Sequence, residues 1–401
     1  MSDLRPRRAN RQKTATVARH GRLRASNAFR AAAKYLAVAL AVALVTTGSV
    51  AAIAGWKLAS SVKPGVSLVG ETGGPPPQIG AIEGGVNFLF VGSDSGGGDP
   101  RYGKRGETLN DVTILLHISQ DHSNATVVSF PRDMFVPIPA CPRLDGKGSY
   151  SAMALQKINT SLTYGGLACT VLTVSRLTGL TIPFAAKIEF NGVIGMANAV
   201  GGVPVCVATA IRDRQISFDL SAGEHTLQGF EALQFLRTRY GVGDGSDLGR
   251  ISNQQVFLSS LVRTVRSADT LSDPLKVYGL AKAAVKNMEL SNSLKNVNTI
   301  VSIALALKDI DPAKIVFLQY PTSYVTDGVA PLKSAANTLV AAIKADRPVR
   351  LTGTTGVGST LNPAAPTPTA SPSATGVEGT VRLPDTVQGQ TAAEQTCSTG
   401  Q

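Results

Sequence analysis

The sequence predicts an α/β or α+β sandwich in which a mixed central β-sheet is flanked by helices. Three short apolar runs rich in β-branched residues have the character of buried strands, at 86–91, 112–118 and 125–129. The last two are separated by a polar turn at 119–124, which suits a hairpin. Later stretches carry apolar residues at the 3.6-residue spacing of helices. Strands mixed with helices, and a hairpin among the strands, favour a mixed sheet.

The positive charge of the chain is concentrated at its beginning. Residues 1–34 carry ten Lys and Arg against the single acid Asp3, so they account for +9 of the formal net charge of +12. The remaining residues are therefore nearly neutral. The basic tail also lacks the interleaved aromatic residues of a nucleic-acid module, so we expect no nucleic-acid partner.

An apolar run follows the basic tail directly. Residues 35–56 contain no charged side chain, and at about 1.5 Å per residue a helix of this length crosses a hydrocarbon core of about 30 Å. We therefore expect one transmembrane helix at 35–57 in the plasma membrane. Arg30 and Lys34 precede it, which places the amino terminus in the cytoplasm and the rest of the chain outside. A cleaved signal peptide with small residues at 52–54 is the alternative, but its basic region would be unusually long.

Changes in composition divide the remaining chain into three parts. Residues 58–80 are rich in Gly, Pro and Ser and are expected to form a linker. Residues 81–350 are expected to form the extracytoplasmic folded domain. Residues 351–401 are expected to form a low-complexity tail, because the stretch up to about 380 is rich in Thr, Ala, Ser and Pro and has few large apolar groups.

Other segments of the predicted domain show strand or helix character by the same criteria. Further strands are expected at 182–190, 203–208 and 314–319. Helices are expected near 150–164, 168–178, 229–237, 248–267, 274–287, 295–308 and 332–344.

The four cysteines all follow the predicted anchor. An even number of cysteines in an oxidising compartment, with no CxxC pair, favours disulfides over metal binding, and buried free thiols are the alternative. Cys141 and Cys169 bracket the predicted helix at 150–164 and are expected to form one disulfide. By elimination Cys206 is left to pair with Cys397, a weaker inference because about 190 residues separate them.

Polar residues meet at one edge of the predicted sheet. Asp94 and Asp111 flank the loop that joins the first two strands, so they lie at the same edge. If the second and third strands form a hairpin, the segment after the third strand returns to that edge with Arg132. The alternative for Asp94 is a simple turn-forming role in a glycine-rich loop. Ladder geometry thus predicts two carboxylates and an arginine close together.

Two further basic clusters lie near 240. Arg237 and Arg239 follow a predicted helix, and they share a face only if the chain there is extended. Arg250 and Gln254 are four residues apart and share one face of the next helix. Helix-end arginines or a solvated face are the structural alternatives. With the carboxylates, these groups predict a polyanion site, because arginine binds phosphate bidentately and Mg²⁺ takes carboxylate and phosphate oxygens.

Several common catalytic motifs are missing from the sequence. It contains no Walker A loop, no nucleophile elbow and no HExxH. Nucleotide hydrolysis, serine hydrolysis and zinc proteolysis therefore lack their usual signals. The segments that carry a more specific pattern are VGSDS (91–95), LNDVTILLHIS (109–119), SFPRD (129–133), KINTSLTYGG (157–166), GGVPVCV (201–207) and LQGFEALQFLRTRYGVGDGSDLGRISNQQ (227–255).

In this order, the segments resemble the LytR-CpsA-Psr family. The resemblance implies a mixed-sheet sandwich with helices on its faces, a hydrophobic groove for a polyprenyl chain and a polar mouth that holds pyrophosphate with Mg²⁺ or Mn²⁺. It implies that Asp94 and Asp111 bind the metal, and that Arg132, Arg250 and Asp247 take part in catalysis. The positions that match its pyrophosphate-binding residues are Arg132, Lys157, Arg237, Arg239, Arg250 and Gln254.

The chain departs from the family pattern at two positions. Leu109 stands where many members have an arginine, so Arg101 or Arg105 would have to supply that phosphate contact. Asn253 also stands where many members have an arginine. The frequent carboxy-terminal accessory domain of the family is not apparent in the sequence.

The resemblance implies a membrane-anchored transferase that moves a glycan-phosphate from a polyprenyl-pyrophosphate carrier to peptidoglycan. Its partners would be the lipid-linked glycan, peptidoglycan and membrane lipid. One of the carboxylates Asp94, Asp111 and Asp247 would take the proton of the attacking hydroxyl. The alternatives are a non-catalytic module that binds lipid-linked glycans in envelope regulation, and a pyrophosphatase that uses water as acceptor.

Overall fold

A computed structural model describes residues 28–60, 64–71, 85–96, 102, 107–267, 273–295, 297–365 and 379–401. The chain divides into two units, Met1–Lys57 and Leu58–Gln401. Helix α1 (Ala28–Ser60) covers the predicted anchor, and most of the predicted basic tail lies outside the described residues. Within the described ranges, no helix is found that is both long and apolar enough to cross a bilayer. The anchor at 35–57 therefore stays a prediction.

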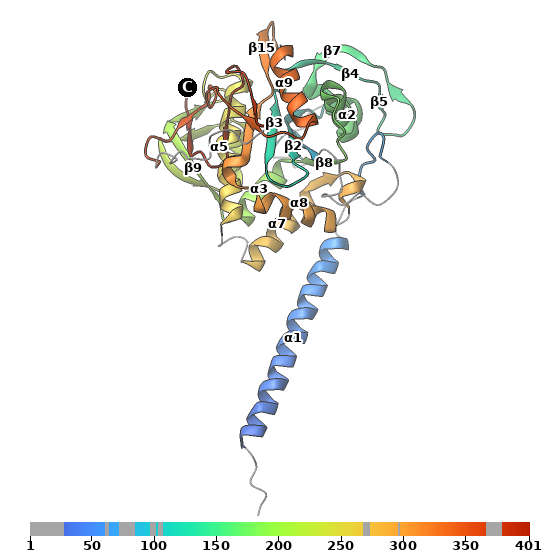
Figure 1. Cartoon of the computed structure of the whole chain (residues 1–401), viewed down its shortest axis with the longest axis vertical. Helices are drawn as coiled ribbons and strands as arrows, with labels where there is room; N and C mark the ends of the chain where they lie inside the picture. Colours follow the sequence, from blue (N-terminus) through green and yellow to red (C-terminus); the bar gives the residue numbers. More distant parts are fainter. Residues whose placement is uncertain are drawn as a thin grey trace, which may run out of the picture. The chain divides into compact units, whose positions relative to one another are not determined.

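The second unit is built on a mixed β-sheet, as the sequence predicts (Figure 1). The first three strands pair antiparallel, whereas the neighbours on either side of these three run parallel to them. Within the described residues the sheet has seven strands, in the order β13 (Met288–Leu290), β8 (Phe184–Ile188), β1 (Val86–Ser93), β2 (Asn110–Ile118), β3 (Ala125–Phe130), β14 (Ile315–Gln319) and β20 (Gly389–Thr391).

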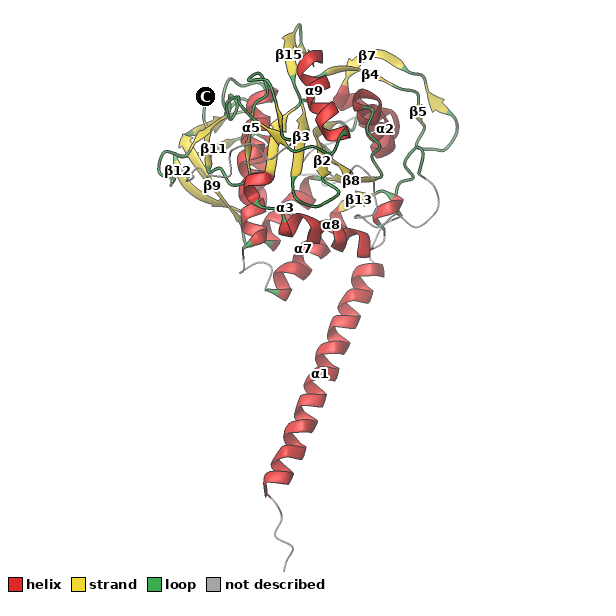
Figure 2. Ribbon diagram, in the orientation of Figure 1, coloured by secondary structure: helices red, strands yellow, loops and turns green. Residues whose placement is uncertain are grey.

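Helices cover both faces of this sheet (Figure 2). Side chains alternate along each strand, so Leu89 and Val91 belong to one apolar core while Phe88 and Phe90 border the other. The first core includes α2 (Ser161–Thr178) and α9 (Lys333–Lys344). The second core is closed by α3 (Phe190–Ala199), α5 (Asp247–Arg266), α7 (Pro274–Asn287) and α8 (Val297–Asp309).

A second sheet packs on the other side of α5 (Figure 2). Its strand order is β12 (Gly223–Leu227), β9 (Val203–Thr209), β21 (Thr396–Thr399) and β18 (Ser359–Leu361). The hairpin of β10 (Ile211–Asp213) and β11 (Phe218–Leu220) and the helix α4 (Gly229–Arg237) share its apolar core.

The remaining strands form two-stranded pairs. These are β4 (Phe135–Ile138) with β7 (Met153–Lys157), β5 (Cys141–Pro142) with β6 (Ser149–Tyr150), β15 (Thr322–Val325) with β16 (Gly328–Pro331), and β17 (Val349–Arg350) with β19 (Val381–Arg382). Three 3₁₀ turns complete the described elements, η3 (Ile158–Thr160), η4 (Asn292–Leu294) and η5 (Pro312–Lys314).

The predicted helix at 150–164 is wrong over most of its length. Residues Met153–Lys157 form β7, which pairs antiparallel with β4, and the helix begins only at Ser161. The sequence MALQK consists of strong helix formers, so pairing with β4 overrides local propensity here. A strand is predicted at 182–190, but β8 ends at Ile188 and helix α3 begins at Phe190. The sequence reasoning did not predict this helix.

The expected low-complexity tail at 351–401 is wrong for much of its length. Strand β20 forms the edge of the central sheet next to β14, and β21 inserts between β9 and β18. These strands are short and rich in Gly, Thr, Ser and Gln, so backbone pairing rather than apolar side chains holds them in place. Residues 366–378 lie outside the described residues.

Part of the expected linker at 58–80 also packs on the domain. Val66 N–H donates to the Leu290 carbonyl at 2.8 Å, and Leu68 is buried in the first core. The Glu71 carboxylate accepts from the N–H groups of Leu68 and Ser293 at 2.9 and 2.7 Å. These bonds fix the segment 64–71 next to β13. Residues 72–84 lie outside the described residues.

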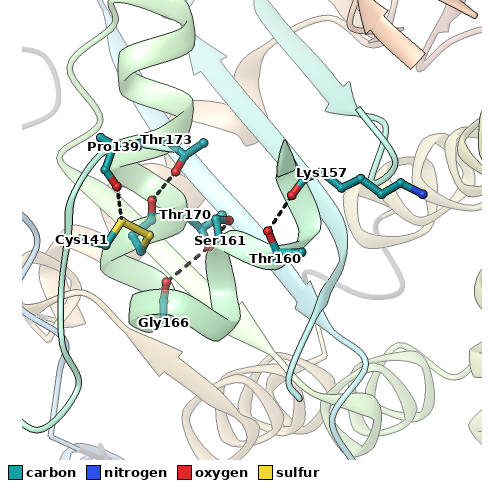
Figure 3. The surroundings of a disulfide bond; sticks show 9 residues. Pro139, Cys141, Lys157, Thr160, Ser161, Gly166, Thr170 and Thr173 are labelled. Carbon is teal, nitrogen blue, oxygen red and sulfur yellow. Dashed lines mark hydrogen bonds between the residues drawn. A yellow bond between two sulfur atoms is a disulfide. The ribbon is translucent and has the colours of Figure 1, made fainter. Parts of the chain in front are cut away.

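Both disulfides that the sequence predicts are present, with Cα–Cα distances of 5.3 Å for Cys141–Cys169 and 4.4 Å for Cys206–Cys397. Figure 3 shows the first of them between the β5 segment and α2. A Cβ on Gly165 would come within 2.8 Å of both Cys169 Cβ and the Pro142 carbonyl. Only glycine therefore allows α2 to approach the Cys141 segment this closely.

Replacing both Cys141 and Cys169 by Ser should lower the free energy of unfolding by roughly 3 kcal/mol, because the bond closes a loop of about 28 residues in the unfolded chain. Guanidinium titration of the purified chain, followed by circular dichroism, measures this loss. An unchanged unfolding midpoint for the double variant would contradict the expectation.

Candidate functional site

Two carboxylates emerge from neighbouring strands at one edge of the central sheet. Ser93 of β1 pairs with Asn110 of β2, and a β-bulge separates this pair from the regular ladder. The buried Asp94 follows, and its Oδ1 accepts the Leu109 N–H at 2.8 Å. Asp111 stands just inside β2. The structure thus brings both predicted metal ligands to the same edge.

Arg132 reaches this edge from the end of β3. The β2–β3 hairpin pairs Thr113 with Phe130, so the next residues lie beside the start of β2. The Arg132 guanidinium forms an ion pair with Asp111 through Nη1 and Oδ1. Burial alone would lower the pKa of Arg132, but the nearby carboxylates of Asp111 and Asp133 outweigh it and raise the pKa. Arg132 is therefore a fixed cation at the site.

The first turn of α5 joins the same cluster. Ser246 caps the helix by accepting the Gly249 N–H. Asp247 accepts the backbone N–H of Arg132 at 2.7 Å with Oδ2 and pairs with Arg250 through Oδ1. Arg250 also donates to the backbone carbonyl of Asp111 at 2.9 Å. Asp247 and Arg250 are 5% and 4% exposed, so this network connects α5 to the sheet edge in a buried setting.

Asp133 is the centre of an outer polar network that the sequence reasoning did not identify. Its carboxylate lies 3.5 Å from Lys157 Nζ, 3.2 Å from Arg239 Nη1 and 3.8 Å from Arg132 Nε. Lys157 ends β7 and Arg239 follows α4, so the three cations come from distant parts of the chain. The only sequence signal for Asp133 was its place directly after Arg132 in SFPRD.

A second carboxylate outside the predicted set, Asp213, shapes the segment after α4. Its Oδ2 accepts from the Thr238 hydroxyl at 2.9 Å and from the N–H groups of Arg239 and Tyr240 at 3.1 and 3.2 Å. Thr238 is extended, with φ −58° and ψ 132°, as required for the helix to end there. Asp213 therefore fixes the backbone conformation of the segment 238–240, which includes Arg239.

The two arginines of this segment have separate surroundings. Arg237 lies over the Phe190 ring, with the guanidinium carbon 4.3 Å from the ring centroid. Arg239 instead pairs with Asp133 and donates from Nε to the Gly245 carbonyl at 3.4 Å. The structure places Arg237 in the wall of an apolar pocket and Arg239 in the outer network.

The apolar pocket opens beside the sheet edge and has about 940 Å³ of empty space, part of it open to solvent. Its walls come from β1, β2, α3, α4 and α5, and include Phe90, Val112, Phe190, Met196, Leu233 and Leu258. Its polar lining is Ser93, Asp111, Glu189, Arg237, Arg250 and Gln254.

Two buried guanidinium nitrogens in the cluster make no hydrogen bond within the described residues, although the Asp133 carboxylate lies 3.8 Å from one of them, Arg132 Nε. The other is Arg250 Nε. Buried N–H groups are almost always satisfied in folded proteins, and charged donors most of all. Phosphate oxygens are natural acceptors for them. Gln254 is less available, because its Nε2 donates to the Leu236 carbonyl at 2.9 Å.

The carboxylates of Asp94 and Asp111 are of the ligand type that a divalent cation such as Mg²⁺ prefers. The described residues include no group of three or more His, Cys, Asp and Glu side chains arranged for a metal. Mg²⁺ commonly takes only one or two carboxylates and completes its shell with substrate phosphates and water. Asp94 and Asp111 offer that hard oxygen set.

The two departures from the family pattern have structural roles. Leu109 contributes its backbone N–H to Asp94, and its side chain supplies no phosphate donor. Asn253 is fully buried and donates from Nδ2 to the Phe235 carbonyl at 2.5 Å. The suggested substitutes Arg101 and Arg105 lie outside the described residues.

Comparison with known proteins agrees with this geometry. The model of the LytR_cpsA_psr family matches residues 71–346, which hold the sheet edge, the pocket and both polar networks. The chain belongs to the LytR-CpsA-Psr family. The family assignment made from the sequence motifs is thus confirmed.

Two of the named relatives come from cell-wall biology. The chain is 28% identical over 276 residues to the cell wall biosynthesis protein LcpA of Corynebacterium glutamicum, covering 61% of this chain and 51% of LcpA. It is 29% identical over 236 residues to TagT of Bacillus subtilis, a polyisoprenyl-teichoic acid–peptidoglycan teichoic acid transferase, covering 54% of this chain and 68% of TagT. The chain spans about half the length of LcpA.

Solved structures share the LytR-CpsA-Psr fold. A LytR-Csp2A-Psr enzyme from Actinomyces oris has a TM-score of 0.53 at 20% identity, covering 71% of this chain and 96% of that one. TagV of B. subtilis has a TM-score of 0.51 at 22% identity, covering 65% and 96%. At these identities the likeness establishes the fold alone.

Asp213→Ala should lower the free energy of unfolding by roughly 3 kcal/mol, because it leaves the donors at 238–240 without their buried acceptor. Asp219→Ala is the matched control on the neighbouring strand, since its side chain is 70% exposed and its ion pair with Arg212 is 3.5 Å long. Thermal or denaturant unfolding of both variants measures the difference. An equal decrease in the free energy of unfolding for the two variants would show that Asp213 does not stabilise the segment 238–240.

Proposed function

We propose that this chain transfers a glycan-phosphate from a polyprenyl-pyrophosphate carrier to peptidoglycan, with the help of a divalent metal. One observation carries the proposal: the lining of an apolar pocket includes Arg237, Arg250 and the carboxylate Asp111. A ligand that fills both parts has a long apolar tail and an anionic head. A polyprenyl pyrophosphate has this form.

The arginines suit a phosphate head group by their number and their unsatisfied nitrogens. Arg132 and Arg250 each have a buried Nε that makes no hydrogen bond among the described residues. Both are already oriented by carboxylates, Arg132 by Asp111 and Arg250 by Asp247. A preorganised guanidinium loses little freedom on binding, so it stabilises charge that develops on phosphoryl oxygens.

Asp94 and Asp111 would hold Mg²⁺ or Mn²⁺ at the sheet edge. When bound, the ion neutralises phosphoryl oxygens and so assists transfer. Asp247 has both oxygens engaged, by Arg250 and by the Arg132 N–H, and we assign it a positioning role. We assign the role of accepting the proton of the acceptor hydroxyl to Asp94 or Asp111.

The transfer step breaks one phosphoanhydride bond and forms one phosphate ester bond, so the product is a phosphodiester. The oxygen of an acceptor hydroxyl forms a bond with the phosphorus that carries the glycan. The bond from this phosphorus to the bridging oxygen breaks, and polyprenyl monophosphate leaves with the electron pair. The hydroxyl proton passes to a carboxylate. Positioning and charge neutralisation account for most of the catalysis in such transfers.

The relatives support this class of reaction. TagT is named as a transferase of teichoic acid from a polyisoprenyl carrier to peptidoglycan, and LcpA as a cell wall biosynthesis protein. We also propose that the helix at 35–57 anchors the chain in the plasma membrane with its folded domain outside. The lipid-linked donor and the enzyme would then share one membrane.

Arg132→Ala should reduce transfer by about 10²- to 10³-fold, the usual effect of removing one preorganised donor to a charged transition state. The assay incubates the full chain in detergent with Mg²⁺, labelled polyprenyl-pyrophosphate glycan and peptidoglycan. Arg212→Ala is the matched control, because its side chain is 77% exposed. A strong loss of thermal stability with unchanged transfer per folded molecule would assign Arg132 a structural role only.

The wild-type chain in the same assay separates the alternatives. Glycan that stays on the lipid in a tight complex indicates a binding or regulatory module. Glycan-phosphate released into solution, without attachment to peptidoglycan, indicates a pyrophosphatase. Removal of the metal with a chelator should stop transfer, and added Mg²⁺ should restore it.

A further inference from the structure

Exposed apolar side chains gather around one loop beside the arginine cluster. Among the described residues from Leu58 onward, Tyr240 and Tyr324 are two of three aromatic residues with strongly exposed side chains, at 55% and 63%. The Tyr324 hydroxyl donates to Asp244 Oδ2 at 3.2 Å, which brings the β15–β16 hairpin to the loop 240–245. Val357, also exposed, lies against Gly243 of the same loop.

This loop is held rigidly by its backbone. Gly243 N–H donates to the Thr399 carbonyl at 2.9 Å, and Gln401 N–H donates to the Gly241 carbonyl at 3.1 Å. The Asp244 carboxylate also accepts the Ser246 N–H at 2.9 Å. The exposed rings therefore stand on a fixed base, and the guanidinium carbon of Arg239 lies 5.6 Å from the centroid of the Tyr240 ring.

The loop 240–245 and the hairpin lie at the outer end of the polar networks, and none of their residues lines the apolar pocket. Asp111 and Arg250 line the pocket, whereas Asp133 is not among its lining residues. Arg132 connects these two groups through its contacts with Asp111 and Asp133.

From Asp133 the contacts continue to the hairpin. Val329 of β16 donates its N–H to the Asp133 carbonyl at 3.2 Å, and Gly328 packs against the same carbonyl. The order of contacts is thus pocket, phosphate-binding arginines, Asp133 and then hairpin. If the lipid fills the pocket, as the proposed function requires, the side of the hairpin is left for the acceptor.

We propose that Tyr240, Asp244 and Tyr324 form the binding subsite for the sugar chain of the acceptor. The inference rests on the proposed function and names the acceptor side of the same site. Sugar rings present C–H faces that pack on aromatic rings, and hydroxyl groups that donate to carboxylates. Exposed tyrosine rings next to a carboxylate supply both kinds of contact.

The ionisation states of Asp244 and Tyr324 suit the binding of sugar hydroxyl groups. Partial burial would raise the pKa of Asp244, but hydrogen bonds from Ser246 outweigh it and lower the pKa, so the group is an acceptor at neutral pH. Burial raises the pKa of Tyr324, so its hydroxyl stays protonated and remains a donor.

The test measures acceptor kinetics with the full chain in detergent, Mg²⁺, saturating labelled polyprenyl-pyrophosphate glycan and soluble peptidoglycan oligosaccharides. Tyr324→Ala and Tyr240→Ala should each raise the acceptor KM about tenfold, which is about 1.4 kcal/mol. The donor KM and kcat should change less than about twofold, a factor that corresponds to under 0.5 kcal/mol. Tyr324→Phe, which keeps the ring but loses the hydroxyl, should show a smaller rise in acceptor KM than Tyr324→Ala.

Phe230→Ala is the matched control, because this aromatic side chain is 49% exposed at the start of α4 and belongs to neither polar network. An unchanged acceptor KM in both tyrosine variants, with normal wild-type transfer, would overturn the subsite and leave the proposed function intact. A fall in kcat alone would also overturn it, since that result indicates a positioning role.

Direct binding keeps the two proposals distinguishable. If the wild type transfers nothing, the proposed function fails, and the affinity of the same oligosaccharides is measured by calorimetry. Binding that weakens in Tyr324→Ala but not in Phe230→Ala supports the subsite. Equal binding in all three proteins, or no binding to any of them, overturns it.

Discussion

The buried carboxylate of Asp247 is the interaction on which the site depends most. It holds the side chain of Arg250 and the backbone N–H of Arg132, and so joins the first turn of α5 to the loop after β3. A buried charge is costly unless it is paired and hydrogen-bonded on all sides, and here both oxygens are engaged. Loss of this group would leave Arg250 buried without its partner and would release the loop that orients Arg132.

Two glutamines of the central sheet, on β14 and β20, also hold α5. Gln319 donates to the Leu248 carbonyl and to Ser252, and Gln390 donates to Ser259 and to the Gln255 carbonyl. Strand β21, tied to β9 by the Cys206–Cys397 disulfide, also contacts this helix. The helix that presents Arg250 is therefore held between two sheets. Gln390 and β21, which make several of these contacts, belong to the segment 351–401, which has few large apolar residues.

Much of the fold follows from short-range features of the sequence. The β-branched runs predict the first three strands, and the polar turn at 119–124 predicts the hairpin, which together place Asp94, Asp111 and Arg132 at one edge. The strand Met153–Lys157 was not predictable from local propensity, because only its pairing with β4 makes it a strand. Asp133 and Asp213 were missed for a similar reason. Their partners come from distant segments, and sequence spacing does not specify which carboxylate meets which cation.

The central claim is that the phosphorus next to the glycan is transferred together with the glycan. The most direct measurement uses a polyprenyl-pyrophosphate glycan labelled with ³²P at that phosphorus, incubated with the full chain, Mg²⁺ and peptidoglycan. The account predicts that the label becomes covalently attached to peptidoglycan through a phosphodiester and that unlabelled polyprenyl monophosphate is released. Label that remains on the lipid, or appears in solution while peptidoglycan stays unlabelled, would contradict it.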